Sequence, residues 1–468
     1  MTAFLIDTLT AFDLAILIYF LAVNTIYLAF TLIAFFRLRS HRRRWTTRAL
    51  GGVMRSPATP GISVVAPAYN EESTVAESVR SLLLLNYPLF EVVLVNDGSK
   101  DRTLDVAVRT FDLVRAPATF EQPIPTQPVR GVYRSISGPD LVMIDKENGG
   151  KADAINAGIN GARYPLVCVI DADSLLEEHA LSRAVLPFIE DPETVAAGGI
   201  VRIVNGSRVE RGRVVDVRLP GNPLAAVQVV EYLRAFLAGR VAQSAMKMLL
   251  IVSGAFGVFR RDAVIRAGGF RTDTIGEDME LVVRLHRIYR ERGAHYRIVF
   301  LPDPVCWTEA PDTVAMLKGQ RNRWQRGTLQ TLGFHRRMLF NPRYGSVGLV
   351  GLPYYLLFEG LGPILELAGY VLTMVGVVLG LIDIVFAQLL FLAAVVYGTL
   401  ISLLAVVLEE LAFRRYPRML DLIKLAAYGI VENFGYRQLT TWWRFMGTVD
   451  YFRGRRDWGV MTRKGFSQ

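Results

Sequence analysis

An uncharged apolar segment at residues 14–36 constrains this chain more than any other feature. It reads LAILIYFLAVNTIYLAFTLIAFF, and as a helix it would be about 34 Å long, enough to cross the hydrocarbon core of a bilayer. It is too long for a cleaved signal peptide, and no small-residue cleavage site follows it. The basic block RLRSHRRRW comes next, which predicts that this end of the helix faces the cytoplasm.

A second apolar region occupies the C-terminal third of the chain. Residues 384–408 predict another span. Residues 347–382 contain Glu359 and Glu366, and they predict either an interfacial helix leading into one span or two short spans. Residues 419–441 carry several charges and predict a helix that faces protein or lies in the interface. The expected division is a transmembrane helix at 1–40, a cytoplasmic domain at 41–340, transmembrane and interfacial helices at 341–445, and a basic cytoplasmic tail at 446–468.

The overall composition agrees with a membrane protein. Hydrophobic residues make up 51%, and the formal net charge is +10. A positive balance favours anionic partners, and the basic residues cluster beside the apolar segments, where lipid headgroups explain them better than nucleic acid does. We therefore expect membrane lipids as partners and no nucleic acid. Cys168 and Cys306 lie in apolar runs and are expected to be reduced and buried.

The region between the apolar segments alternates strand-like and helix-like patterns. Strand-like runs include GISVVAPAY, FEVVLVNDGS, LVMIDK and YPLVCVID, and the segments between them have helical spacing. This alternation predicts an open α/β sheet with helices on both faces. The Pro-rich stretch 116–139 and residues 205–223 are predicted to be surface loops.

Polar residues follow the predicted strands at 69–72, 96–99 and 171–173. In open α/β sheets, ligands bind beyond the carboxyl ends of the strands. Asp171 and Asp173 offer two carboxylates that suit a hard divalent cation bridging to phosphates, although solvated carboxylates in a turn would look the same. No Walker motif and no G-x-G-x-x-G follows a strand, which excludes those nucleotide-binding classes by sequence.

Two further motifs allow two interpretations each. Glu277 and Asp278 open a predicted helix; they either stabilise its N-terminus or supply a general base. QRNRW at 320–324 contains guanidinium groups that could neutralise a diphosphate and an indole that could stack on a sugar. The same segment could also be a basic membrane anchor with an interfacial Trp.

Taken in order, these motifs resemble a membrane-embedded family 2 glycosyltransferase, of the type that includes cellulose, chitin, hyaluronan and poly-N-acetylglucosamine synthases. The resemblance covers roughly residues 60–335 and the flanking membrane helices. It is carried by APAYNEE (66–72), VNDGSKD (95–101), ENGGKADAINAGI (147–159), DADS (171–174), SGAFG (253–257), GED (276–278) and QRNRW, which fits the family's Q-x-x-R-W.

The resemblance implies an α/β GT-A (Rossmann-like) domain inserted between transmembrane helices, and an inverting transfer from a UDP-sugar with Mg²⁺ or Mn²⁺. By the same resemblance, Asp278 is the catalytic base, and Asp173 with Asp171 binds the metal. The implied donor-binding residues are Tyr69, Glu71, Asp97, Lys151, Asp171 and Arg323. The implied acceptor-binding residues are Ser253, Gly254, Glu277, Gln320 and Trp324.

The function expected from the resemblance is a processive synthase that builds and exports a β-linked polysaccharide at the inner membrane face. One alternative adds a single sugar to a lipid-linked acceptor. Another, of a different class, is an inactive nucleotide-sugar-binding scaffold of an envelope complex. No PilZ-like domain follows the membrane helices, and the membrane part is short, so a homo-oligomer or a partner subunit could complete an export channel.

Overall fold

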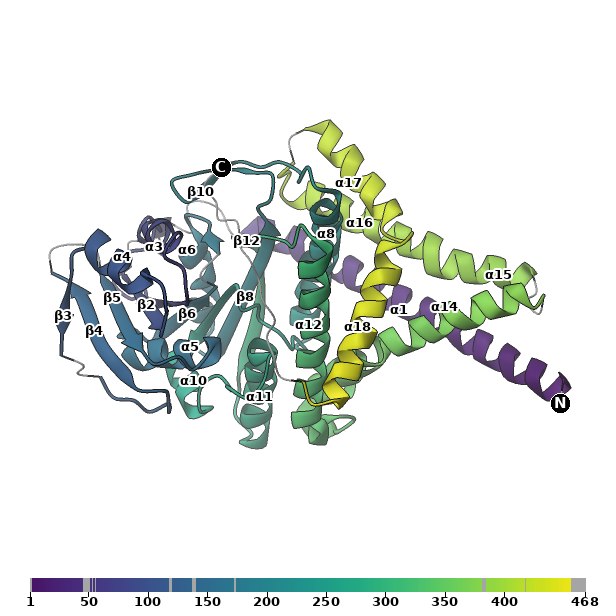
Figure 1. Cartoon of the computed structure of the whole chain (residues 1–468), viewed down its shortest axis with the longest axis horizontal. Coiled ribbons are helices and arrows are strands. Elements are labelled where there is room, and N and C mark those ends of the chain that lie inside the picture. Colours follow the sequence, from purple (N-terminus) through teal and green to yellow (C-terminus); the bar gives the residue numbers. More distant parts are fainter. Residues whose placement is uncertain are drawn as a thin grey trace.

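The computed structural model describes residues 2–44, 51–52, 54, 56–117, 120–136, 140–171, 174–380, 384–416 and 418–455. An α/β domain forms one end of the molecule, and long helices project from the other end (Figure 1). This arrangement confirms the expected α/β domain between helices long enough to cross a membrane.

A mixed sheet forms the centre of the α/β domain. Its middle strands are parallel and run through apolar, mostly β-branched sequence that is buried on both faces, as expected where helices cover both sides. In spatial order, the described strands are β3 (Leu113–Ala116), β4 (Val129–Ser135), β5 (Leu141–Lys146), β2 (Phe90–Asp97), β1 (Ile62–Ala68), β6 (Leu166–Ile170), β11 (Phe256–Arg260), β8 (Thr194–Ile203), β12 (Arg297–Thr308) and β7 (Leu175–Leu176).

Two predicted loops contain strands instead. Within 116–139, β4 pairs antiparallel with β5 and β3. Within 205–223, β9 (Arg208–Glu210) and β10 (Arg213–Asp216) form a separate antiparallel pair. Neither segment has an apolar run that signals a strand. Pairing with a neighbouring strand, rather than burial of both faces, therefore accounts for these elements.

Cys168 and Cys306 are free and buried in the sheet, as expected.

Short helices cover the sheet, and a second layer of helices separates it from the helices that project (Figure 1). The covering helices are α3 (Val75–Leu83), α4 (Thr103–Thr110), α5 (Lys151–Gly161), α6 (Ala180–Ala184), α7 (Leu186–Glu190), α10 (Arg261–Arg266) and α11 (Glu277–Glu291). The separating layer contains α8 (Pro223–Tyr232), η1 (Leu233–Arg240), α9 (Val241–Ala245), α12 (Val314–Phe334), η2 (Arg336–Met338), η3 (Pro342–Tyr344) and α18 (Tyr436–Phe452).

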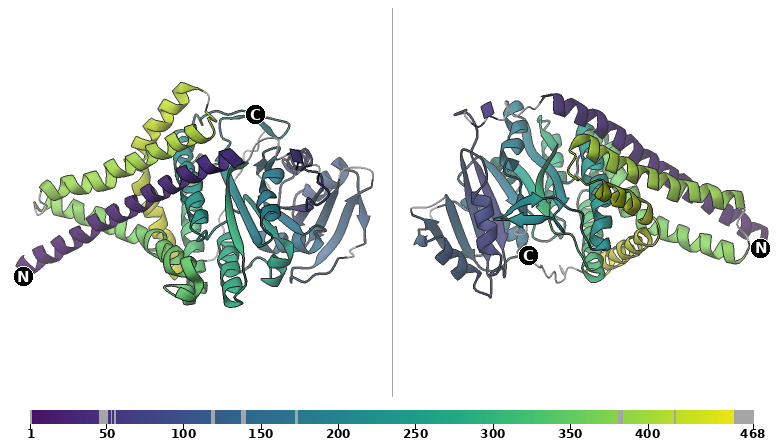
Figure 2. Two further views of the ribbon diagram at one scale, coloured as in Figure 1. Left: turned by 180° about the vertical axis from the view of Figure 1, so that it is seen from behind. Right: turned by 90° about the horizontal axis from the view of Figure 1, so that it is seen from above.

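Three helical stretches of the described chain are long and apolar enough to span a membrane: Ala11–His41, Val347–Val378 and Ile384–Ala412. The first belongs to α1 (Thr2–Arg44), which runs beside the other two in both views of Figure 2. Residues 347–378 form one candidate span by length and composition, and the choice between an interfacial helix leading into one span and two short spans stays a prediction. The second stretch comprises η4 (Val347–Gly351), α13 (Leu352–Tyr354), η5 (Tyr355–Gly360) and α14 (Gly362–Val378); the third comprises α15 (Ile384–Phe391), η6 (Leu392–Val396) and α16 (Tyr397–Ala412).

The segment 419–441, predicted as one helix, is two. The first, α17 (Met419–Val431), ends before Gly435, whose φ of 93° lets the chain turn. The second, α18, packs along α12 (Figure 1). The predicted basic tail begins inside α18, and its residues 456–468 lie outside the described part of the chain.

Candidate functional site

The loops after β1 and β2 are bound to each other at the carboxyl edge of the sheet. Asn70 donates its backbone N–H to Ser99 Oγ at 3.0 Å, and its own Oδ1 accepts the N–H of Lys100 at 2.8 Å. The N–H of Glu71 is donated to Thr103 Oγ1 at 2.8 Å. Tyr69, which follows β1 directly, remains 45% exposed. Its ring is therefore available to a ligand at the edge where the sequence predicts nucleotide binding.

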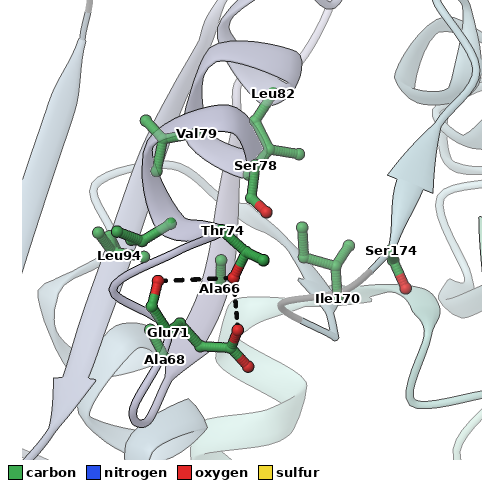
Figure 3. A pocket seen from close by; sticks show the side chains of 11 residues that line it. Ala66, Ala68, Glu71, Thr74, Ser78, Val79, Leu82, Leu94, Ile170 and Ser174 are labelled. Carbon is green, nitrogen blue, oxygen red and sulfur yellow. Dashed lines mark hydrogen bonds between the residues drawn. The ribbon is translucent and has the colours of Figure 1, made fainter. Parts of the chain in front are cut away.

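A small pocket opens between the β1–α3 connection and the end of β6 (Figure 3). Apolar side chains line most of it, and Glu71, Thr74 and Ser174 contribute polar atoms. Thr74 donates its hydroxyl to the Glu71 carboxylate at 2.5 Å. This bond orients Glu71, so the pocket combines an apolar wall with one fixed carboxylate.

Asp97 ends β2 and is buried, with 3% of its surface exposed. Its carboxylate accepts hydrogen bonds from Lys146 Nζ at 2.7 Å and from the backbone N–H groups of Gly149 and Gly150 at 3.0 and 2.8 Å. The side-chain amide of Asn148 adds a fourth bond at 3.2 Å. The structure therefore places Asp97 as the anchor of the 147–150 loop, and its predicted contact with the donor stays a prediction.

Lys151 stands at the N-terminus of α5 and connects two other predicted residues. Its Nζ lies 2.5 Å from Asp171 Oδ1 and 3.3 Å from Glu277 Oε1. Burial alone would lower the pKa of Lys151, but Asp171, Glu277 and Asp278 together raise it above its ordinary value. The ammonium group is therefore held charged, and its side chain is still 21% exposed.

Glu277 and Asp278 begin α11 next to this lysine. The N–H of Gly254 is donated to Asp278 Oδ2 at 3.0 Å, and a Cβ on Gly254 would lie 2.9 Å from Lys151 Nζ. Glycine is thus the residue that lets this backbone approach both groups. Burial raises the pKa of Glu277; Lys151 opposes that rise, whereas Asp278 adds to it.

Five predicted residues thus meet at one place: Lys151, Asp171, Gly254, Glu277 and Asp278. They come from the start of α5, the end of β6, the loop before β11 and the start of α11. We call these five residues the catalytic cluster. Ser253 lies beside them, half-buried, and its Oγ accepts the N–H of Ala255 at 3.4 Å.

The predicted metal ligand Asp173 lies outside the described residues. In the described part of the chain, no group of three or more His, Cys, Asp or Glu side chains is arranged to hold a metal. Asp171, the other predicted ligand, belongs to the catalytic cluster, and its side chain is 26% exposed. A carboxylate oxygen is the donor type that Mg²⁺ and Mn²⁺ prefer beside phosphates, so the residue fits the predicted cation.

Helix α12 carries the QRNRW motif and packs against the start of α11. Gly327 contacts Gly276, since a Cβ on either glycine would lie 3.0 Å from the Cα of the other. Arg323 precedes Gly327 by four residues and therefore lies on the same face of the helix. Trp324 is 45% exposed, whereas Gln320 and Arg323 are buried. The motif is thus next to the N-terminus that carries Asp278, and the predicted contact of Arg323 with the donor stays a prediction.

The prediction missed three residues that hold this helix. Arg321 forms an ion pair with Glu231 of α8 at 2.6 Å, and Tyr436 of α18 bonds to the same carboxylate at 2.7 Å. Lys146, the partner of Asp97, was missed as well. Arg321 lies inside a quoted motif and could have been singled out. Glu231 and Tyr436 carry no sequence signal, because their partners are distant in the chain.

Comparisons with known proteins agree with the motifs. Residues 127–327 match the family model described as "Glycosyltransferase like family 2", and residues 63–120 match "Glycosyl transferase family 2". The poly-beta-1,6-N-acetyl-D-glucosamine synthase of Staphylococcus aureus (strain COL) is 29% identical over 273 residues, which are 58% of this chain and 55% of that protein. The synthase of the same name from Staphylococcus epidermidis gives the same figures. The match therefore spans about half the length of these curated relatives.

Among solved structures, the mannosyltransferase PcManGT from Pyrobaculum calidifontis, in complex with GDP-Man and Mn²⁺, aligns with 94% of this chain and all of its own. The identity is 18% and the TM-score is 0.49, a likeness that carries no argument about ligands.

Proposed function

We propose that this chain, a member of glycosyltransferase family 2, transfers a sugar from a nucleotide donor to a growing β-linked polysaccharide at the membrane. The single observation that carries the proposal is the catalytic cluster: a charged lysine and three carboxylates converge at the carboxyl edge of the sheet. The relatives from Staphylococcus aureus and Staphylococcus epidermidis bear the name poly-beta-1,6-N-acetyl-D-glucosamine synthase. UDP-N-acetylglucosamine is therefore the first donor to test.

In the proposed reaction, Asp278 is the general base. The N–H groups of Gly254 and Met279 bind its two carboxylate oxygens at 3.0 and 2.8 Å, which fixes the direction of the carboxylate. It removes the proton from the acceptor hydroxyl as that oxygen attacks the anomeric carbon. The nucleotide leaves from the opposite face, so one displacement inverts the configuration. Such general-base assistance contributes about 10²–10⁴-fold to the rate.

The leaving diphosphate requires positive charge. Lys151, held charged by its neighbours, and Arg323 would stabilise the negative charge that grows on the diphosphate. A Mg²⁺ or Mn²⁺ ion held by Asp171 and Asp173 would neutralise the phosphate oxygens when it is bound. Tyr69, Glu71 and Asp97 would hold the nucleoside end, and Asp97 would do so through the loop that it anchors.

The acceptor would approach from the membrane side. Trp324 is exposed on the helix that contacts the start of α11, and its indole provides a flat surface for a sugar ring, with Gln320, Glu277 and Ser253 nearby in the proposed acceptor site. The basic block after the first span orients the α/β domain toward the cytoplasm, so synthesis at the inner face, followed by export, is part of the proposal.

A donor screen tests the proposal. Purified full-length protein is mixed with UDP-N-acetylglucosamine, UDP-glucose, UDP-glucuronate and UDP-galactose, with and without Mg²⁺ or Mn²⁺, and released UDP is measured. Radiolabelled product is then separated by size. We expect UDP release from one donor, loss of release in EDTA, and a ladder of long products. A single lipid-linked product would overturn the polysaccharide assignment, and no release from any donor would favour a binding scaffold.

A further inference from the structure

We propose that Glu231 and Arg321 are positioning residues that hold the indole of Trp324 in place for the acceptor sugar. This inference rests on the proposed function, because it assigns the support of the acceptor site in that reaction. Neither residue contacts the reacting atoms. Glu231 acts through Arg321, and Arg321 acts on the Trp324 ring.

The contact geometry supports each step. Arg321 NH2 lies 2.6 Å from Glu231 Oε2, and the guanidinium carbon of Arg321 lies 4.5 Å from the centroid of the Trp324 ring. This distance is within the range of a cation–π contact. Arg321 is 2% exposed, whereas Trp324 is 45% exposed. The guanidinium therefore occupies protein-covered space beside the ring, and a large part of the indole remains open to a ligand.

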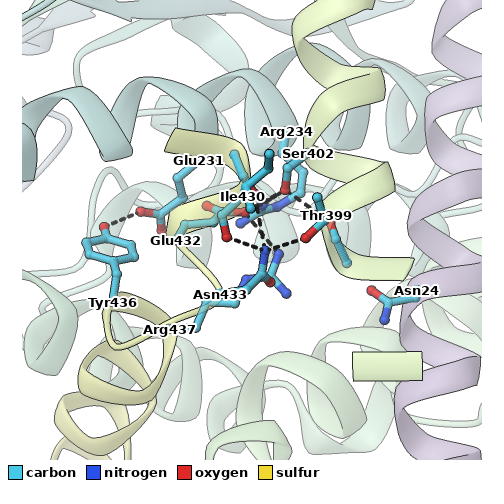
Figure 4. A network of polar contacts seen from close by, with 12 residues as sticks. Asn24, Glu231, Arg234, Thr399, Ser402, Ile430, Glu432, Asn433, Tyr436 and Arg437 are labelled. Atoms are coloured by element: carbon cyan, nitrogen blue, oxygen red, sulfur yellow. Dashed lines mark hydrogen bonds and ion pairs between the residues drawn. The ribbon is translucent and has the colours of Figure 1, made fainter. Parts of the chain in front are cut away.

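Tyr436 makes the carboxylate rigid. Its hydroxyl donates to Glu231 Oε2 at 2.7 Å and accepts from Arg321 NH2 at 3.3 Å. Glu231, Arg321 and Tyr436 come from α8, α12 and α18, so three helices meet at this triangle. Figure 4 shows Glu231 and Tyr436 directed toward each other. A tryptophan supported in this way loses less freedom when a sugar stacks on it, which favours binding.

The carboxylate that holds Arg321 is itself on a well-anchored helix. Arg234, three residues after Glu231, binds Glu432 at 2.5 Å and Ser402 at 2.7 Å, and Arg437 binds the same Glu432 at 3.1 Å (Figure 4). Glu432 and Ser402 are fully buried. The segment that contains Glu231 and Arg234 therefore makes contacts in two directions. Glu231 binds Arg321 beside Trp324, and Arg234 binds α16 and the residue after α17.

Packing alone does not account for the arginine. Replacing a buried ion pair with apolar side chains of similar volume is often neutral or stabilising, so the pair is weak evidence for a purely structural role. Arginine differs from lysine in having a flat, delocalised cation that stacks on aromatic faces. At position 321, that flat group is in contact with the one exposed indole of the QRNRW motif.

The decisive variant is Arg321→Lys, which keeps a positive charge for Glu231 but removes the flat group from the Trp324 ring. We expect it to shorten the radiolabelled product made from UDP-N-acetylglucosamine and to raise the KM for an added β-1,6-linked N-acetylglucosamine oligosaccharide about 3- to 30-fold. The rate of UDP release at saturating acceptor should stay within about twofold of the wild type. Glu231→Gln should give the same pattern, and the double variant should show less than the sum of the two effects.

Glu409→Gln is the matched control. It removes the carboxylate of another arginine ion pair, Arg202 with Glu409 at 2.7 Å, which is buried at both ends and does not include Trp324. Two results would overturn the positioning role. In the first, this control shortens the product as much as Arg321→Lys does. In the second, Arg321→Lys leaves product length and acceptor KM unchanged although Trp324→Ala alters them.

A second measurement does not depend on activity. The contribution of Trp324 to acrylamide quenching is the difference between each protein and the same protein carrying Trp324→Phe. We expect this contribution to change in Arg321→Lys and to stay as in the wild type in Glu409→Gln. An unchanged value in Arg321→Lys would contradict the support of the indole. If the wild type released no UDP from any donor, the proposed function would fail, and the quenching result would still decide the role of Arg321.

Discussion

Two lysine–carboxylate pairs lie at the same edge of the sheet, and their surroundings differ. Lys146 and the side chain of Asp97 are 0% and 4% exposed, whereas Lys151 and Asp171 are 21% and 26% exposed. The Asp97 carboxylate accepts bonds from Lys146, an amide and two backbone N–H groups. The Lys151 group instead faces three carboxylates with room left for solvent. We call these the closed pair and the open pair.

Residue type alone therefore does not identify a catalytic carboxylate. Asp97 ends one buried strand, Asp171 follows another, and each has a lysine partner. The 147–150 loop supplies N–H donors to Asp97 and leaves its carboxylate little capacity for a ligand, which suits a structural anchor. The open pair keeps charge in a partly solvated site, where a substrate phosphate can replace water. Variants of the open pair and of the closed pair should therefore behave differently.

Asp278→Asn should reduce sugar transfer about 10²–10⁴-fold, because the amide cannot accept the acceptor proton. Donor binding should remain, since Lys151 and Asp171 are unchanged. UDP release and calorimetric donor titration measure the two effects. An Asn variant with normal turnover would remove Asp278 from the role of base and leave the open pair without its proposed chemistry.

Asp97→Asn should destabilise the fold by about 3 kcal/mol, because breaking a buried ion pair leaves an uncompensated charge. Lys146 keeps a second carboxylate partner, Asp153, at 3.6 Å. We therefore expect a loss of unfolding free energy at the lower end of the range usual for buried ion pairs. Thermal unfolding in detergent measures it. A variant with unchanged thermal stability but a large, selective loss of donor affinity would contradict this. Asp97 would then bind the donor directly and would not be a structural anchor.

Lys151→Gln should weaken donor binding about 10- to 100-fold, since it removes a charge-assisted hydrogen bond. Its effect on thermal stability should be small beside that of Lys146→Gln, which leaves Asp97 buried without its cation. Measuring donor affinity and melting temperature for both variants compares the two lysines directly. Equal losses of stability in the two variants would contradict the distinction between open and closed pairs.

The smallest expected effect is a pH dependence that arises from Glu277. Its pKa is raised in the folded state, mainly by burial, with Lys151 opposing. The folded state therefore binds this proton more tightly than the unfolded state, so the contribution of Glu277 to stability is lost as pH rises from about 4.5 through the raised pKa. Glu277→Gln should gain stability relative to the wild type over that interval and keep a constant difference above it. Melting temperatures of both proteins measured from pH 4.5 to 8 check the sign, and an advantage of Glu277→Gln over the wild type that grew as the pH fell would refute it.

Some of this molecule could be predicted because the signals were local. The apolar runs at β1, β2, β5 and β6, the long apolar helices and the motifs at strand ends each depend on residues that are close in sequence. Lys151 and Asp171 lie together because the carboxyl ends of the parallel strands β5 and β6 meet at the same edge of the sheet. Glu277 reaches the same place from the start of α11, which no strand-end pattern predicted. The division of the chain into named domains and the roles of individual site residues stay predictions.

Other features depend on partners that are far apart in the chain, and no local pattern predicts them. β4 forms within a Pro-rich segment because β5 offers it a hydrogen-bonding edge, and the helix predicted over 419–441 breaks where Gly435 turns toward α12. The hydrogen bonds from the 147–150 loop to the Asp97 carboxylate and the ion pair between Arg321 and Glu231 also require the assembled fold. The order of residues is enough to say which groups of the chain are apolar, charged or able to bind a phosphate. Packing decided which of those groups are buried with all their bonds made and which remain open to a substrate, because solvent access and long-range pairing are properties of the folded chain.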